Sequence, residues 1–188
     1  MAKVEANISM SLDGFVTGPN LDRYPGLGEG GDVLHAWIHE SRAMDFAMGE
    51  ERQIAGSVIT SQKVYDLTGG WGDDGFYRMP VFVVTHRPHD VVVKDKTTFT
   101  FVTEGVEHAI EQAIVAAGDK LVHIMGGASI IQQALAAGLV DELFLHVAPV
   151  VLISGTRLFE HLGGPIQLER AEVIESREAT HLRYRIVK

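Results

Sequence analysis

Short apolar runs alternate with amphipathic segments along most of the chain, a pattern typical of α/β proteins. The continuous apolar run Val81–Val84 is typical of a strand buried in a parallel sheet. From Glu104 to Ala117 apolar residues recur at helical spacing, and Gly118 follows as a suitable C-cap, so this segment is predicted to be a helix. Other strands are predicted at Val4–Ser9, Ser57–Thr60, Phe99–Val102, the apolar run from Leu121, and Leu143–Val147. Other helical segments are predicted at Leu34–Ile54 and Gln62–Leu67.

The last part of the chain changes character. Leu168–Glu175 and Ala179–Val187 are predicted to be two antiparallel strands. In the second of them, apolar and mostly charged positions alternate: Leu182, Tyr184 and Ile186 against Arg183, Arg185 and Val187. We therefore predict a single three-layer α/β domain over residues 1–188, completed by a C-terminal antiparallel hairpin.

Length, charge and cysteine content narrow the class of protein. A chain of 188 residues is long enough for one domain and too short for two comfortable ones. The formal net charge of −9 argues against nucleic acid or an anionic membrane as partner, although a few local donors suffice for an anionic cofactor. The absence of cysteine excludes disulfides and thiolate catalysis and fits a cytoplasmic protein. Neither a secretion signal nor a membrane span is predicted.

A glycine pair, Gly126-Gly127, follows the apolar run from Leu121 and precedes an amphipathic segment that ends at Gly138. This order predicts a strand, a tight turn and a helix, and the free amides at such a helix start favour an anion, typically a phosphate. A Rossmann fold would place its glycines after the first strand, where this chain has the turn Leu12-Asp13-Gly14. The Walker pattern is also absent. The turn therefore serves another nucleotide-binding architecture, or it is structural and binds nothing.

Several motifs occur in one order along the chain: Ser11–Phe15, Val84–Pro88, Met125–Ile130, Gly138–Leu143 and Ala148–Phe159. Together they resemble the dihydrofolate reductase-like superfamily. They are more closely similar to stand-alone relatives of the reductase domain at the C-terminus of bifunctional riboflavin-biosynthesis (deaminase-reductase) enzymes. This resemblance covers essentially the whole chain. It implies a mixed, mostly parallel central sheet flanked by helices, and a reductase that uses NADPH.

The resemblance also implies which residues bind the cofactor. The glycine turn would approach the pyrophosphate and the neighbouring sugar, with Gly126, Gly127, Ala128, Ser129 and Ile130. A second group would recognise the adenosine 2′-phosphate, with Thr85, His86 and Arg87, whose hydroxyl and guanidinium suit a dianion. A third group would lie near the nicotinamide, with Val16, Thr17 and Gly18.

The chain departs from the family pattern at two positions. Dihydrofolate reductases usually carry Gly-Arg-x-Thr after the second strand, and here Ser61, Gln62 and Lys63 stand instead, with Lys63 as a point charge in place of a guanidinium fork. This leaves the preference for NADPH over NADH open. Met125 stands where riboflavin-pathway reductases tend to have a carboxylate, which argues against their substrate.

No residue is assigned as the catalytic acid. Asp45 lies 16 residues before Ser61, about where dihydrofolate reductases carry an acid that contacts the pterin, but Glu40, Glu50 and Glu51 could serve equally. Asp13 is a second weak candidate, although an aspartate before glycine is also a natural turn residue. Apolar walls for a dry hydride-transfer pocket could come from Phe15, Trp37 and Phe46.

Two further features allow a functional and a structural interpretation. His35 and His39 have helical i,i+4 spacing, but no third ligand is evident, so no metal site is predicted. Trp71, in a glycine-rich loop, is either a mobile lid over substrate or a simple anchor.

The sequence thus favours an NADPH-dependent reductase that transfers a hydride to a small heteroaromatic, pterin- or pyrimidine-like substrate. One alternative is a non-catalytic dinucleotide-binding or sensing protein on the same fold, and a second is dihydrofolate reductase proper. A homodimer is expected, because the apolar run Ala148–Ile153 and the C-terminal strands could form an interface and relatives of this kind are often dimers.

Overall fold

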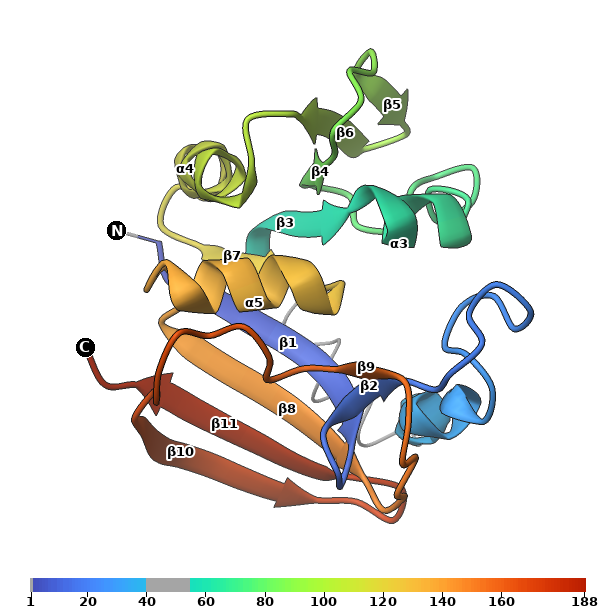
Figure 1. The fold of residues 1–188 in the computed structure, drawn as a ribbon. Helices are drawn as coiled ribbons and strands as arrows, with labels where there is room; N and C mark the ends of the chain where they lie inside the picture. The colour runs from blue at the N-terminus through green and yellow to red at the C-terminus, as the bar shows by residue number, and fades with distance from the viewer. Residues whose placement is uncertain (1, 40–54) are drawn as a thin grey trace.

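The computed structural model describes residues 2–39 and 55–188, and its main element is a nine-stranded sheet in the order β10-β11-β8-β1-β7-β3-β4-β6-β5 (Figure 1). The strands from β8 to β6 in this order run parallel, and β5, β11 and β10 run antiparallel to their neighbours. The bounds are β1 Val4–Ser11, β3 Ala55–Ser61, β4 Pro80–Val84, β5 Val92–Lys94, β6 Thr97–Val102, β7 Leu121–Ile124, β8 Glu142–Ala148, β10 Leu168–Glu175 and β11 Thr180–Ile186. The mixed, mostly parallel sheet and the C-terminal hairpin are as predicted.

Two helices, α4 (Val106–Ala117) and α5 (Ala128–Ala136), pack on one face of the sheet (Figure 1). The side chains beneath them come from alternate strand positions, for example Val4 and Ala6 of β1, so one apolar core forms between sheet and helices. A short helix, α3 (Gln62–Leu67), follows β3. None of the described helices is long and apolar enough to cross a membrane.

Four details differ from the sequence prediction. Three short strands were missed: β5, and β2 (Phe15–Thr17) and β9 (Thr156–Arg157), which form a separate antiparallel pair. Their two or three residues are too few to show a strand period. The predicted helix Leu34–Ile54 is wrong at its start, where the structure has a 3₁₀ helix, η1, at Gly31–His39; residues 40–54 lie outside the described part. Leu34 and Trp37 are three residues apart, and a 3₁₀ helix places both on its buried side.

Candidate functional site

The predicted cofactor residues gather at one edge of the sheet, where the parallel strands end. In sheet order, β1, β7, β3 and β4 are neighbours, and all run in the same direction. Each of the four strands is followed by one predicted group: β2 after β1, the glycine turn after β7, Ser61–Lys63 at the end of β3, and Thr85–Arg87 after β4. Because the carboxyl ends of open α/β sheets are where ligands bind, this edge is the candidate site.

The glycine turn starts where the Met125 amide donates to the Ile59 carbonyl at 3.1 Å, which ties the end of β7 to β3. Gly126 has φ +130°, a conformation open essentially to glycine alone, and its peptide bond to Gly127 is cis. Gly127 is different, because its backbone is extended and a Cβ added there would lie 3.7 Å from Ser61 Oγ, at ordinary contact distance. The protein's own packing therefore does not require a glycine at Gly127, and its missing side chain leaves room for a methyl group beside Ser61 and α3; we call this space the cradle.

The first turn of α5 opens directly from this cradle. Gly127 is its N-cap residue, and no side chain of the described residues caps it. The amides of Ile130 and Ile131 donate back to the Gly127 carbonyl, whereas Ser129 is exposed at the helix start. Helix-start amides and the helix dipole both favour an anion, so this turn has the chemistry that a pyrophosphate needs.

Ser61, Gln62 and Lys63 lie on the opposite side of the cradle. The Ser61 hydroxyl accepts from the Val64 amide at 3.3 Å and so caps α3. Gln62 donates to Asp66 at 2.7 Å, while its own carbonyl oxygen Oε1 is buried and has no hydrogen-bond partner among the described residues. Lys63 is exposed. The buried oxygen of Gln62 and the accessible ammonium of Lys63 therefore lie where dihydrofolate reductases usually carry the arginine of Gly-Arg-x-Thr.

Thr85, His86 and Arg87 directly follow the end of β4. Thr85 is buried; its amide donates to Val102, and its hydroxyl accepts from the Arg87 amide at 3.1 Å. His86 and Arg87 are exposed. The threonine thus shapes the turn, and the two basic side chains remain accessible to an anion.

Val16, Thr17 and Gly18 belong to β2 and its end. Val16 is buried, and the Thr17 hydroxyl bonds to Thr156 of β9. A Cβ on Gly18 would lie 2.0 Å from the Glu29 carbonyl oxygen, so close approach of the following loop already requires this glycine. Internal packing therefore explains Gly18, in contrast to Gly127.

Asp13 holds two loops together. Its carboxylate accepts from the Ser11 hydroxyl at 2.6 Å and from the amides of Leu152 and Ile153 at 3.0 and 2.8 Å. The hydrogen bond from Ser11, followed by those from the two amides, lowers the pKa of Asp13 to about 2. An ionised carboxylate with these partners favours the structural interpretation of Asp13. Asp45, Glu40, Glu50, Glu51 and Phe46 lie outside the described residues.

Trp71 is packed as an anchor. Its ring stacks on Phe99 with centroids 6.1 Å apart and meets Tyr77 edge-on at 5.1 Å. The Lys94 ammonium from β5 donates to three carbonyls of the same glycine-rich loop, those of Gly69, Gly70 and Gly72, at 3.1, 2.9 and 2.8 Å. Between the two interpretations that the sequence left open, these contacts favour the anchor over the lid.

Sequence analysis missed a buried histidine pair. His146 of β8 and His181 of β11 share a hydrogen bond between their Nδ1 atoms at 2.7 Å, and each is 1% exposed. No motif or spacing signals this pair, because only the pairing of β8 with β11 brings the two residues together. In the part of the chain that the structure describes, no group of three His, Cys, Asp or Glu side chains could hold a metal ion.

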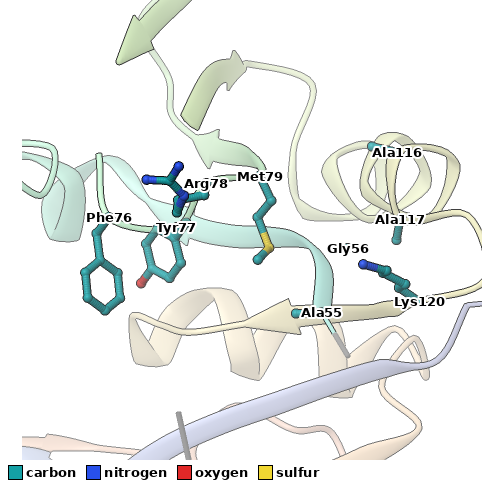
Figure 2. A pocket seen from close by; sticks show the side chains of 9 residues that line it. All are labelled: Ala55, Gly56, Phe76, Tyr77, Arg78, Met79, Ala116, Ala117 and Lys120. Carbon is teal, nitrogen blue, oxygen red and sulfur yellow. The ribbon is translucent and has the colours of Figure 1, made fainter. Parts of the chain in front are cut away.

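A hollow of about 400 Å³ lies at the opposite edge, where β3 and β4 begin (Figure 2). Lys120 reaches into it toward Met79, whereas the Arg78 guanidinium turns away and pairs with Asp95 at 3.2 Å (Figure 2). None of the predicted cofactor residues lines this hollow. It is separate from the candidate site.

The strand order defines an α/β protein with the dihydrofolate reductase-like fold. Residues 2–182 match the model of the RibD C-terminal domain, so the chain belongs to that family. Such membership supports an oxidoreductase of the reductase type. A comparison with curated proteins gives no match.

Solved structures share the fold at low sequence identity. A proposed riboflavin biosynthesis protein from Shewanella sp. PV-4 is 21% identical, with a TM-score of 0.77 and 100% of both chains covered. The riboflavin biosynthesis reductase of Saccharomyces cerevisiae is 12% identical, with a TM-score of 0.66 and coverage of 99% of this chain and 90% of that one. Dihydrofolate reductase from Enterococcus faecalis, solved with NADP(H), is 12% identical, with a TM-score of 0.61 and coverage of 99% and 97%.

Proposed function

We propose that the protein is an NADPH-dependent reductase that transfers a hydride to a small heteroaromatic, pyrimidine- or pterin-like substrate. One observation carries the proposal: four sequence-distant segments with suitable chemistry meet at the carboxyl edge of β1, β7, β3 and β4. Family membership supports the reductase class. The solved relatives support the fold.

The residues at this edge fit the cofactor. The amides of the first α5 turn and the cradle at Gly127 would hold the pyrophosphate, with Lys63 as a nearby cation. The exposed Arg87, beside Thr85, would bind the adenosine 2′-phosphate, which NADH lacks. The Gly127 cradle is the part of this fit that internal packing leaves unexplained.

Bound NADPH would supply the hydride, and the chain must exclude water and provide a proton. Phe15 and Val16 are 4% and 6% exposed and would form a dry wall near the nicotinamide. Asp13 is a poor proton donor, because a carboxyl with a pKa of about 2 is ionised near neutral pH. Asp45 remains a candidate for the acid, beside Glu40, Glu50 and Glu51.

The proposal is tested by thermal unfolding with each cofactor and by NADPH oxidation, followed in the near ultraviolet, with a panel of pterins and pyrimidines. We expect NADPH to raise Tm more than NADH does, and one class of substrate to be turned over. No stabilisation by either cofactor at millimolar concentration would overturn the proposal. Binding without oxidation of NADPH by any compound would identify the sensing alternative, and turnover of dihydrofolate with antifolate binding would identify dihydrofolate reductase proper.

We also propose that the protein is a homodimer. Leu12, Val151 and Ile153 are 70%, 56% and 80% exposed, and Asp13 fixes their loops side by side. Large apolar side chains gathered in this way favour a protein partner over solvent. Size-exclusion chromatography with light scattering should give twice the chain mass of 20.5 kDa, and a clean 20.5 kDa species would exclude the dimer.

A further inference from the structure

A row of hydrogen-bonded polar side chains crosses the face of the sheet that lies opposite α4 and α5. Its centre is the His146–His181 pair, with 2.7 Å between the two Nδ1 atoms. On one side, His146 Nε2 lies 2.9 Å from Asn7 Oδ1 of β1; on the other, His181 Nε2 lies 3.2 Å from the Ser176 hydroxyl. The row therefore connects β1, β8, β11 and the hairpin turn, and the two histidines at its centre have almost no access to water.

The partners define where the protons are. Asn7 Oδ1 can only accept, so His146 carries its proton on Nε2. The Nδ1 atom of His146 must then accept, and His181 donates to it from its own Nδ1. Nε2 of His181 is the remaining basic nitrogen. With both rings neutral, one proton lies between the two histidines, and the single hydrogen of the Ser176 hydroxyl can go either to His181 Nε2 or to the Ala179 carbonyl, 3.1 Å away.

Trp37 of η1 covers this pair. Its ring lies over His146, with centroids 4.2 Å apart, and meets His181 edge-on at 5.2 Å. Its indole N–H donates to the Ser9 hydroxyl at 2.9 Å, and the side chain is only 3% exposed. The helix that carries Trp37 also contacts β2, the strand of Val16. The pair is thus joined through one tryptophan to an element of the candidate cofactor edge.

The surroundings oppose a charge on the pair. Burial, then the neighbouring His181, hold the pKa of His146 well below 6.5, and Arg183 adds to this. The other titratable groups that face the pair from the described elements are His123 of β7, His35 of η1, Glu5 of β1 and Glu142 of β8. Both carboxylates pair with Arg183, and burial raises the pKa of Glu5 to about 7, so Glu5 titrates in the same pH range as the proposed transition. An extra proton would place a cation in these buried surroundings, and a second would make both Nδ1 atoms donors and so break the bond between the rings.

We propose that His146 and His181 are positioning residues that hold Trp37 and η1 against the cofactor edge only while both rings are uncharged, so that acid releases them. The expected effect on NADPH binding rests on the proposed function, whereas the expected release of Trp37 does not. As the pH falls, the surroundings of Trp37 in the parent protein are expected to change before the protein unfolds.

The direct test follows the two indole N–H signals of the full chain by NMR from about pH 7.5 to about pH 5, with Trp71→Phe used to assign them. We expect the Trp37 signal to move with a midpoint below 6.5 while the Trp71 signal stays constant. His181→Asn keeps a donor toward His146 but takes up no proton, so its Trp37 signal should match that of the parent at neutral pH and lose the transition. His35→Gln, on the same helix as Trp37, is the matched control and should keep the transition.

A transition that persists unchanged in His181→Asn, or that disappears in His35→Gln, would overturn the proposal. His181→Phe, which removes the donor, should displace the Trp37 signal already at neutral pH; if it folds and the signal is unchanged, the positioning role is wrong. NADPH affinity, measured in parallel, should fall about tenfold across the transition in the parent but not in His181→Asn. If NADPH binds at no pH, the proposed function fails, and the Trp37 signals still decide the role of the pair.

Discussion

Alanine substitutions at Gly126 and Gly127 separate the needs of the fold from those of the cofactor. At Gly126 the backbone φ of +130° is strained for alanine, so Gly126→Ala should destabilise the fold by about 1–3 kcal/mol. This corresponds to a Tm that falls by roughly 3–10 °C for a chain of this size. At Gly127 the backbone is extended and a Cβ has 3.7 Å of room, so Gly127→Ala should leave Tm unchanged or raise it slightly.

The effect on NADPH binding should be the reverse. A methyl group at Gly127 would occupy the cradle proposed for the pyrophosphate, and overpacking of about 1–3 kcal/mol lowers affinity by roughly 5- to 150-fold. The assay is calorimetric titration of each variant with NADPH, beside thermal unfolding without ligand. If Gly127→Ala binds NADPH as tightly as the parent does, our assignment of the pyrophosphate site is wrong. If it lowers Tm as much as Gly126→Ala, the glycine has a structural role that we have missed.

The remaining predictions concern the loops, the 2′-phosphate and acid stability. Lys94→Met removes three hydrogen bonds to the Trp71 loop and should lower stability by about 1–2 kcal/mol, seen as a lower Tm and faster proteolysis within residues 68–79; an unchanged loop would refute the anchor. Arg87→Ala should weaken NADPH binding about tenfold and leave NADH binding nearly unchanged, whereas equal losses would argue against 2′-phosphate recognition. Burial lowers the pKa of His123 to about 4, so its neutral form stabilises the fold above pH 6.5 and this contribution, about 3 kcal/mol, is lost as the pH falls from 6.5 to about 4. Burial raises the pKa of Glu5 to about 7, so its contribution to stability changes with pH in the opposite direction. Urea unfolding of His123→Asn and of the parent at two pH values isolates the contribution of the histidine. If the free energy of unfolding changes equally with pH in both proteins, His123 is not the source of the acid destabilisation.

The sequence predicts the fold well where apolar periodicity is strong. Val81–Val84 and the segment 104–117 become β4 and α4, with a start at Val106 for the helix. Short elements carry too little periodicity, so β2, β5 and β9 are visible only once their partners are known. The mixed, mostly parallel character of the sheet came from the resemblance; the order of its strands was not predicted and could not be derived from local patterns.

The two faces of the C-terminal strand show what pattern alone leaves undecided. Leu182 and Tyr184 pack against the core as their spacing suggests. On the other face, polar His181 is buried as well, and Arg183 is largely enclosed by its pairing with Glu5. Alternation of polar and apolar residues suggests a solvated face, but here the polar face is buried because its groups satisfy one another.

The candidate site could also be predicted only in part from the sequence. Each cofactor segment was named from its motif, and the topology brings the four segments to one edge. What the sequence could not supply was the distinction between Gly127, which the fold does not need, and Gly18, which it does. The catalytic acid also stays open, because Asp45 lies outside the described residues and Asp13 is engaged in holding two loops.

The central claim is that NADPH binds at the carboxyl edge of β1, β7, β3 and β4. Hydrogen–deuterium exchange with and without saturating NADPH tests it most directly, because protection is read along the whole chain. We predict protection at residues 15–18, 61–67, 85–89 and 125–131 together, and weaker protection with NADH. Protection confined to other regions, such as the hollow lined by Met79 and Lys120, or no protection at millimolar NADPH, would contradict the claim.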